Sequence, residues 1–124
     1  MKFIELPLRD EILEALEDLG FDDMFPIQEN AIPVMLEGKN VVGQAKTGTG
    51  KTASFGVPML EMLDPHSGSV EGFVIAPTRE LAQQITDDIN SYAKYMDSYA
   101  ISIYGGVAIG PQVDQLRKGP TIVV

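Results

Sequence analysis

Residues 45–52 of the chain read Ala45-Lys46-Thr47-Gly48-Thr49-Gly50-Lys51-Thr52. An apolar lead-in at 40–43 precedes this stretch and a helix-compatible run follows it. The whole has the strand, glycine-rich turn and helix of a phosphate-binding loop, of the pattern G-x-x-x-x-G-K-[ST]. Ala45 departs from the pattern, because it stands where the first glycine would be. A glycine-rich turn without a ligand is the alternative interpretation of the same residues.

The residue types in this loop suit phosphate chemistry. Gly48 and Gly50 allow backbone conformations that a side chain would forbid, so the backbone can approach a phosphate closely. The N–H groups of residues 47–52 can then converge on an anion at the N-terminus of the following helix. Lys51 supplies a cation for the β- and γ-phosphates, and the Thr52 hydroxyl is placed to bind Mg²⁺. The loop therefore predicts a site for a nucleoside triphosphate with Mg²⁺.

Composition narrows the remaining function classes. The chain has 124 residues, of which 44% are hydrophobic and 22% charged, as expected for one globular domain at most. Its formal net charge of −9 argues against broad electrostatic adhesion to nucleic acid or to an anionic membrane, so any nucleic-acid contact is expected to be local. The lack of cysteine excludes disulfides and thiolate metal sites and fits a cytoplasmic location. No apolar run approaches the roughly 18 residues of a membrane span, and no signal peptide is expected.

Apolar segments of two kinds alternate along the chain and predict an α/β fold. Short apolar runs are expected to form strands at 40–44, 73–76, 100–104 and 121–124, with 73–76 buried on both faces. Helical periodicity predicts helices over 8–19, 27–36, 51–62, about 79–95 and 112–118. This alternation predicts a parallel sheet with ligands at the carboxyl ends of its strands. The last strand has no turn or helix after it, so we expect a truncated chain.

Three loops at that sheet edge carry the residues of interest. They are residues 45–52, residues 77–82 with the sequence Pro77-Thr78-Arg79-Glu80-Leu81-Ala82, and Gly105-Gly106. A purely structural protein would have little reason to place all three on one edge. His66 is the only histidine, and it is expected to be an exposed loop residue rather than a catalytic base.

These stretches resemble the motifs of the DEAD-box RNA helicases. Residues 45–52 look like their motif I, in which alanine is usual at the first position, and residues 77–82 match motif Ia letter for letter. The pair Gly105-Gly106 is similar to their GG motif. The stretch from Gly20-Phe21 to Pro26-Ile27-Gln28 resembles their Q motif, and Phe3 falls where the family keeps an isolated upstream aromatic residue.

The resemblance covers nearly the whole chain and implies a RecA-like P-loop fold, truncated, with helices flanking a parallel sheet. It divides the chain into an N-terminal helical segment with the Q motif at 1–39 and a partial ATP-binding domain at 40–124. In folds of this family, strands that come later in the chain lie next to the phosphate-loop strand. Independent stability of this piece is therefore in question, because backbone groups of the sheet would lack partners.

The resemblance also implies how ATP is held. Gln28 would bond the amino group and N7 of adenine, because an amide offers an acceptor and a donor side by side, and this would select ATP over GTP. Phe21 and Phe3 would pack on or near the base, with plain core packing as the alternative for Phe3. Lys51 and Thr52 would keep their phosphate and Mg²⁺ roles and would be catalytic in the parent enzyme.

RNA binding is implied at the other two loops. Sequence-independent contacts to the sugar–phosphate backbone of one RNA strand would come from Pro77, Thr78, Arg79, Glu80, Gly105 and Gly106. The alternative for Arg79 and Glu80 is that they cap their own helix.

The sequence departs from the family pattern in two ways. Met24 and Phe25 stand where the Q motif usually has a proline and a serine or threonine whose hydroxyl helps to fix the loop, so looser adenine selectivity is expected. The sequence also contains no Asp-Glu-Ala-Asp, no Ser-Ala-Thr and no second RecA-like domain. Those elements would position the attacking water, hold Mg²⁺ and supply positive charge at the γ-phosphate.

The sequence therefore predicts the N-terminal part of the first RecA-like domain of an ATP-dependent RNA helicase that unwinds short RNA duplexes. Its expected partners are RNA and the missing remainder of its own helicase core, and the chain alone is expected to be inactive as an enzyme. Three alternatives remain open: another P-loop enzyme such as a kinase, a non-catalytic nucleotide- or RNA-binding module, and a DNA-directed helicase.

Overall fold

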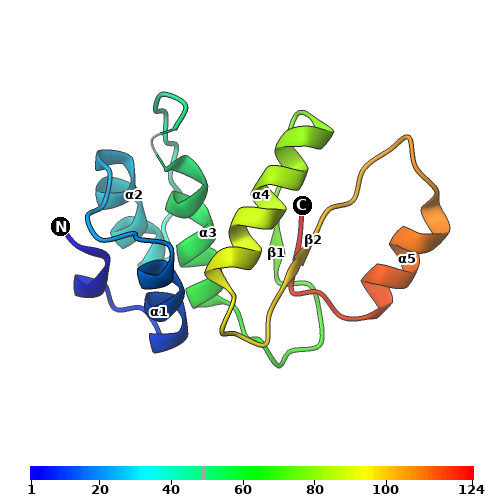
Figure 1. Ribbon diagram of the computed structural model, residues 1–124, viewed down its shortest axis with the longest axis horizontal. Coiled ribbons are helices and arrows are strands. Elements are labelled where there is room, and N and C mark those ends of the chain that lie inside the picture. The colour runs from blue at the N-terminus through cyan, green and yellow to red at the C-terminus, as the bar shows by residue number, and fades with distance from the viewer. Residues whose placement is uncertain (49) are drawn as a thin grey trace.

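The computed structural model describes residues 1–48 and 50–124. In chain order its elements are η1 (Phe3–Glu5), α1 (Asp10–Asp18), α2 (Pro26–Leu36), α3 (Lys51–Met62), β1 (Gly72–Phe73), α4 (Arg79–Tyr92), β2 (Ala100–Ile101), α5 (Ile109–Arg117) and β3 (Ile122–Val123). Figure 1 shows η1 and helices α1 to α3 on one side, α4 next to the strands, and α5 standing apart at the other end. Within the described ranges, no helix is long and apolar enough to cross a bilayer.

Helix boundaries follow local signals in the sequence. Helix α1 ends just before Gly20, which has a φ of +76° and donates its N–H to the Glu17 carbonyl at 2.9 Å. Such a left-handed glycine ends a helix without steric cost. Helix α3 begins at Lys51, directly after Gly50 with its φ of +78°. The helix predicted over 51–62 is confirmed at both ends.

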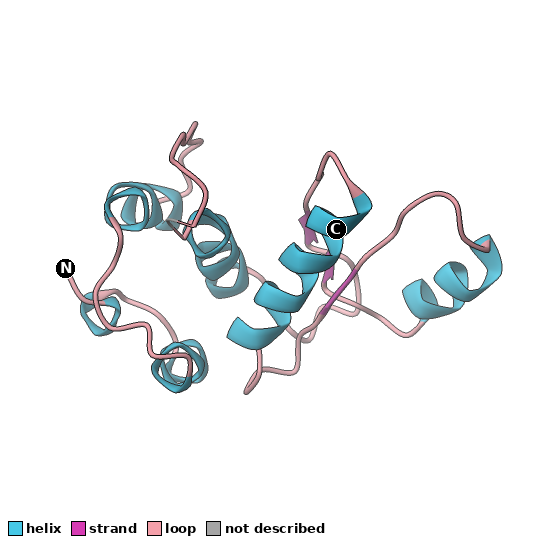
Figure 2. Ribbon diagram, turned by 45° about the horizontal axis from the view of Figure 1, so that its top comes forward, coloured by secondary structure: helices cyan, strands magenta, loops and turns pink. Residues whose placement is uncertain are grey.

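The strands form a three-stranded parallel sheet in the order β1-β3-β2. Ile122 in the central strand β3 pairs with Gly72 of β1 on one side and with Ala100 of β2 on the other. Parallel neighbours need crossover connections, and helices α4 and α5 lie within those connections. Figure 2 shows α4 crossing in front of the strands. The predicted α/β fold, with a parallel sheet and flanking helices, is confirmed.

The strand predicted at 40–44 is absent, and that prediction was wrong. These residues have no regular secondary structure and are exposed, with Val42 at 101%. A strand persists when its N–H and C=O groups bond to a neighbour, and no strand in the described part of the chain pairs with 40–44. The prediction rested on the apolar run alone, which carries no information about a partner strand.

The prediction that 73–76 is buried on both faces was also wrong. Phe73 is 69% exposed and Ile75 is 83% exposed, whereas Gly72 is buried and Val74 packs against the core. Helix α4 covers one face of the sheet, and α5 contributes no buried residue. The second face of β1 therefore remains open.

One hydrophobic core joins the two segments that the motifs divide at residue 39. Ile32 of α2, Val57 of α3, Ile89 of α4 and Ile122 of β3 are all 0% exposed, and they share a cluster with Phe3. Burying a side chain of this size contributes about 1.5–3 kcal/mol relative to leaving it in water. Helices α1 to α4 and the strands thus share one core, whereas α5 contributes no residue to it, and the two-part division stays a prediction from the motifs.

Candidate functional site

The phosphate loop lies at the N-terminal end of α3. Gly48 and Gly50 have φ values of +79° and +78°, the left-handed region that other residues rarely adopt. The two glycines turn the chain back on itself, and the ammonium nitrogen of Lys51 donates to the Ala45 carbonyl at 2.6 Å across the turn. The loop is therefore closed by its own lysine.

The N-terminus of α3 is suited to an anion. No acidic residue occupies its first turn, where the first backbone N–H groups of a helix have no intrahelical partner. Thr52 is half-buried in that turn, and Lys46 and Thr47 are exposed ahead of it. Thr49, which the sequence predicts to be part of the loop, lies outside the described residues.

Three donors converge on the carbonyl oxygen of Gly50. The amide nitrogen of Gln28 donates at 3.1 Å, the Ser54 hydroxyl at 3.1 Å and the Ser54 backbone N–H at 3.3 Å. The other end of the Gln28 amide, its Oε1, accepts the Phe25 N–H at 2.9 Å. Gln28 therefore ties the start of α2 to the phosphate loop.

This arrangement bears on how Gln28 would read a base. The side chain is 2% exposed, and both its oxygen and its nitrogen bond to backbone groups of the protein. A base could bind the same two atoms in one of two ways. Either the Gln28 amide turns away from Gly50, or it uses the second lone pair of Oε1 and the second hydrogen of Nε2 for the base. Adenine recognition by Gln28 stays a prediction.

Phe3 and Phe21 belong to a row of aromatic rings. The centroids of Phe3 and Phe21 are 6.0 Å apart, and Phe21 lies 6.1 Å from Tyr92 of α4. Phe3 is 3% exposed, so the structure supports the core-packing interpretation of this residue. Burial raises the pKa of the Tyr92 phenol, and the charge of Asp88 adds to the effect, so this ring stays neutral.

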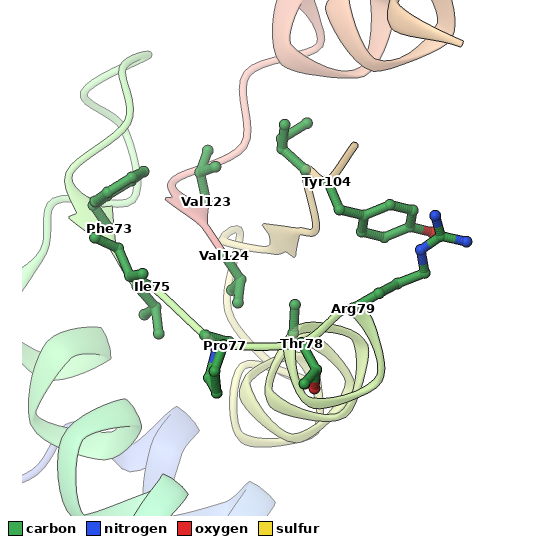
Figure 3. Close-up of a pocket in the computed structure, with 12 residues that line it drawn as sticks. Phe73, Ile75, Pro77, Thr78, Arg79, Tyr104, Val123 and Val124 are labelled. Atoms are coloured by element: carbon green, nitrogen blue, oxygen red, sulfur yellow. The ribbon is translucent and has the colours of Figure 1, made fainter. Parts of the chain in front are cut away.

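Arg79 joins the two stretches that resemble RNA-binding motifs. Its Nη2 donates to the Gly105 carbonyl at 2.9 Å, and its guanidinium carbon lies 4.8 Å from the centroid of the Tyr104 ring. Gly106 has a φ of +80°, and a Cβ built there would stand 2.6 Å from Arg79 Nη2. Figure 3 shows the Arg79 head group beside Tyr104. Motif Ia and the GG pair are thus held together by one side chain.

Thr78 provides the cap of α4. Its hydroxyl oxygen accepts the Leu81 N–H at 3.1 Å, as an N-cap residue does. Glu80 is exposed in the first turn, where its charge is favourable to the helix dipole. Thr78 therefore provides the side-chain cap of α4. The alternative in which Arg79 caps this helix is not seen, because Arg79 bonds to Gly105 instead.

A cavity of about 420 Å³ opens beside these residues at the carboxyl ends of the strands (Figure 3). Its lining is largely apolar and includes Phe73, Ile75, Pro77, Val123 and Val124. Thr78, Arg79 and Tyr104 supply polar groups to the same lining. The structure thus brings residues 77–79 and 104–106 to one sheet edge. The prediction also placed residues 45–52 at this edge, but they follow no strand of the sheet that the described residues form.

Three residues of these sites carry roles that the motifs did not indicate. Phe25 contacts the phosphate loop, Ser54 bonds to Gly50, and Tyr104 stacks under Arg79. The Ser54 contact had a signal in the sequence, because a serine inside a helix often bonds to the carbonyl four residues earlier. The other two depend on tertiary packing.

A glycine-rich loop before a helix, together with a parallel sheet and two loops that meet at its edge, is the fold pattern of the P-loop class of α/β domains. The family model described as DEAD/DEAH box helicase matches residues 25–124. The chain belongs to this family.

Individual relatives agree with the family match. A DEAD-box ATP-dependent RNA helicase CshA of Bacillus cereus is 48% identical over 122 residues, which cover 98% of this chain and 23% of that protein. A helicase CshA of Listeria monocytogenes is 46% identical, over 99% of this chain and 24% of its own length. The crystal structure of a DEAD box protein from Methanococcus jannaschii aligns with a TM-score of 0.94 at 42% identity, covering 100% of this chain and 34% of that one. The chain spans about a quarter of the length of the curated relatives.

Proposed function

We propose that this chain is the N-terminal part of the ATP-binding domain of an ATP-dependent RNA helicase, and that it binds ATP with Mg²⁺ and the backbone of single-stranded RNA. The observation that carries the nucleotide proposal is the phosphate loop itself. Gly48 and Gly50 are left-handed, and Lys51 begins α3 with no acid in its first turn. The names of the relatives, which are ATP-dependent RNA helicases, support the choice of nucleotide and polymer.

Each loop residue has a physical role in this proposal. The β-phosphate accepts from backbone N–H groups of the loop residues 47, 48 and 50–52. Lys51 exchanges the Ala45 carbonyl for phosphate oxygens, because a charged acceptor gives the stronger hydrogen bond. Thr52 offers one hydroxyl oxygen to Mg²⁺. This ion commonly binds through few protein oxygens together with substrate phosphates, so it is expected to arrive with ATP. Gln28 reads adenine once its amide turns from Gly50.

The RNA contact is proposed at the sheet edge where Arg79 bonds to Gly105. Its guanidinium, the backbone of Gly105 and Gly106, and the start of α4 at Pro77, Thr78 and Glu80 meet there. A strand held by its sugar–phosphate backbone is bound irrespective of base sequence. The net charge of −9 makes this contact depend on Arg79 rather than on a broad basic surface.

Hydrolysis and unwinding are proposed for a whole helicase core, in which this chain would work with the remainder of that core. For the chain alone we propose nucleotide binding without useful turnover, because the motifs that position water and metal are absent from its sequence. RNA-stimulated ATP hydrolysis by the purified chain would contradict this part of the proposal.

Calorimetric titration with Mg-ATP and with Mg-GTP tests the nucleotide site. Wild-type chain is expected to bind ATP, and Lys51→Ala to weaken it at least about tenfold, the usual size of a lost charge-assisted hydrogen bond. Lys39→Ala is the matched control, because Lys39 is an exposed cation paired with Glu37 at 2.9 Å outside the loop. Equal affinity of the wild type and Lys51→Ala would overturn the site. Equal affinity for ATP and GTP would contradict adenine recognition by Gln28 but would leave the phosphate site unaffected.

A further inference from the structure

We propose that the Phe25 ring is the stacking surface for the nucleotide base. This inference rests on the proposed function, since it needs a nucleoside triphosphate in the phosphate loop. It assigns an affinity-determining contact to a residue that stands where the Q motif, which this stretch resembles, usually has a serine or threonine.

Phe25 is anchored next to the phosphate loop. It is the residue immediately before α2, and its N–H donates to Gln28 Oε1 at 2.9 Å. Its ring lies against Gly50, because a Cβ built on Gly50 would stand 3.1 Å from Phe25 Cδ2. Gln28 in turn bonds to the Gly50 carbonyl, so ring, amide and loop form one connected unit.

The ring also has a free face. Phe25 is 51% exposed although it contacts the loop. Among the aromatic rings of residues 1–48 and 50–124, only Phe25 is both exposed and in contact with the phosphate loop. The other exposed rings, away from the loop on β1 or beyond the end of α4, are Phe73, Tyr95 and Tyr99. The remaining rings are packed on other residues, namely Phe3, Phe21, Phe55, Tyr92 and Tyr104, the last under Arg79.

The position of the phosphates limits where a base can lie. With the phosphates at the N-terminus of α3, the base of the same nucleotide can reach the Phe25 ring beside Gly50. This flat apolar ring then excludes water from one face of the base. Every base has a π-face, so stacking raises the affinity for ATP and GTP by the same factor, typically about tenfold. Stacking leaves the distinction between adenine and guanine to Gln28. Phe25 thus sets how tightly a base is held, whereas it does not decide which purine is held.

The sequence offers a direct optical test, because it contains no tryptophan. The variant Phe25→Trp contains a single tryptophan, and a base stacked on it is expected to quench the tryptophan emission. Addition of Mg-ATP or Mg-GTP should quench its emission, whereas inorganic tripolyphosphate, which has no base, should bind without quenching. Phe73→Trp is the control, since Phe73 is 69% exposed on β1.

Affinity provides the second measurement. Phe25→Ala is expected to weaken Mg-ATP and Mg-GTP by the same factor, about tenfold, and to leave tripolyphosphate affinity unchanged. Unchanged emission of Phe25→Trp at saturating ATP would overturn the proposal. So would equal losses of ATP and tripolyphosphate in Phe25→Ala, which would show a merely structural contact with the loop. If the wild type binds neither tripolyphosphate nor nucleotide, the proposed function itself fails, and the stacking role with it.

Discussion

Helices α3 and α5 show how differently two parts of this chain are held. Helix α3 packs between α2 and α4, and half of its residues are buried: Ala53, Ser54, Gly56, Val57, Pro58 and Leu60. Helix α5 buries none of its residues, and its apolar side chains Ile109, Val113 and Leu116 are exposed. Figure 1 shows α5 away from the other helices. The phosphate loop therefore leads into a helix of which half is buried, whereas the loop with Gly105-Gly106 leads into a helix with no buried residue.

The same contrast separates the two faces of the sheet. The face under α4 carries buried apolar residues, whereas Phe73 and Ile75 of the β1 segment face outward. Stability should therefore depend on the α3–α4 side and hardly at all on the open face. Substitutions in matched pairs can test this difference.

The largest effect is expected from Ile89→Ala compared with Ile75→Ala. Ile89 is 0% exposed, so truncation should lower the free energy of unfolding by about 2–5 kcal/mol. Ile75 is 83% exposed, and the same truncation should change it by less than about 0.5 kcal/mol. Urea unfolding followed by circular dichroism measures both. Equal losses would mean that the open face of β1 is covered in solution.

An intermediate effect is expected from two glycines. A Cβ on Gly72 would stand 2.6 Å from Met59 Sδ and 2.9 Å from Ile122 Cγ1, so Gly72→Ala should destabilise by about 1–3 kcal/mol through overpacking. A Cβ on Gly56 in α3 would meet Ile89 at an ordinary 3.4 Å, so Gly56→Ala should be neutral or stabilise by up to about 1 kcal/mol through helix propensity. Thermal unfolding of both variants gives the sign. A stabilising Gly72→Ala would contradict the packing of β1 on α3.

The smallest effect is expected at Asp18, on the surface between α1 and α4. A hydrogen bond from Tyr95 and then one from Lys94 at 3.3 Å lower the pKa of Asp18 below its ordinary value of 3.8. A lowered folded-state pKa stabilises the protein above the ordinary value, and this contribution disappears as the pH falls through the lowered one. Asp18→Asn should therefore reduce Tm slightly at pH 7 and have no effect once Asp18 is protonated. A difference in Tm that is independent of pH would contradict this.

The sequence predicted the features that depend on neighbouring residues, and it failed for those that depend on contacts between distant parts of the chain. The start of α3 and the end of α1 depend on Gly50 and Gly20, which act within one helical turn, so the sequence is sufficient for them. The residues at 40–44 have strand character, but a strand depends on a partner that local sequence does not specify. The motifs indicated that residues 77–79 and 105–106 meet at one sheet edge, because loop positions follow from the order of strands and helices.

Contacts within the sites were less predictable. The bond from Arg79 to Gly105 joins residues 26 apart, and no spacing rule fixes it. The contact of Phe25 with Gly50 arises because α2 packs on α3, although the sequence had marked Phe25 as a departure from the motif. Side-chain placement at this level follows from tertiary packing.

The most direct test of the central claim, that the phosphate loop and the sheet edge at Arg79 and Gly105-Gly106 bind two different ligands, is an amide spectrum of the ¹⁵N-labelled chain. Mg-ATP is expected to shift the N–H signals of Gly50 and Lys51 and to leave Gly105 and Gly106 unchanged. A single-stranded uridine oligonucleotide is expected to do the reverse, with the strongest shifts at Arg79 and Gly106. Shifts of the same residues by both ligands, or of neither loop by either one, would contradict the account.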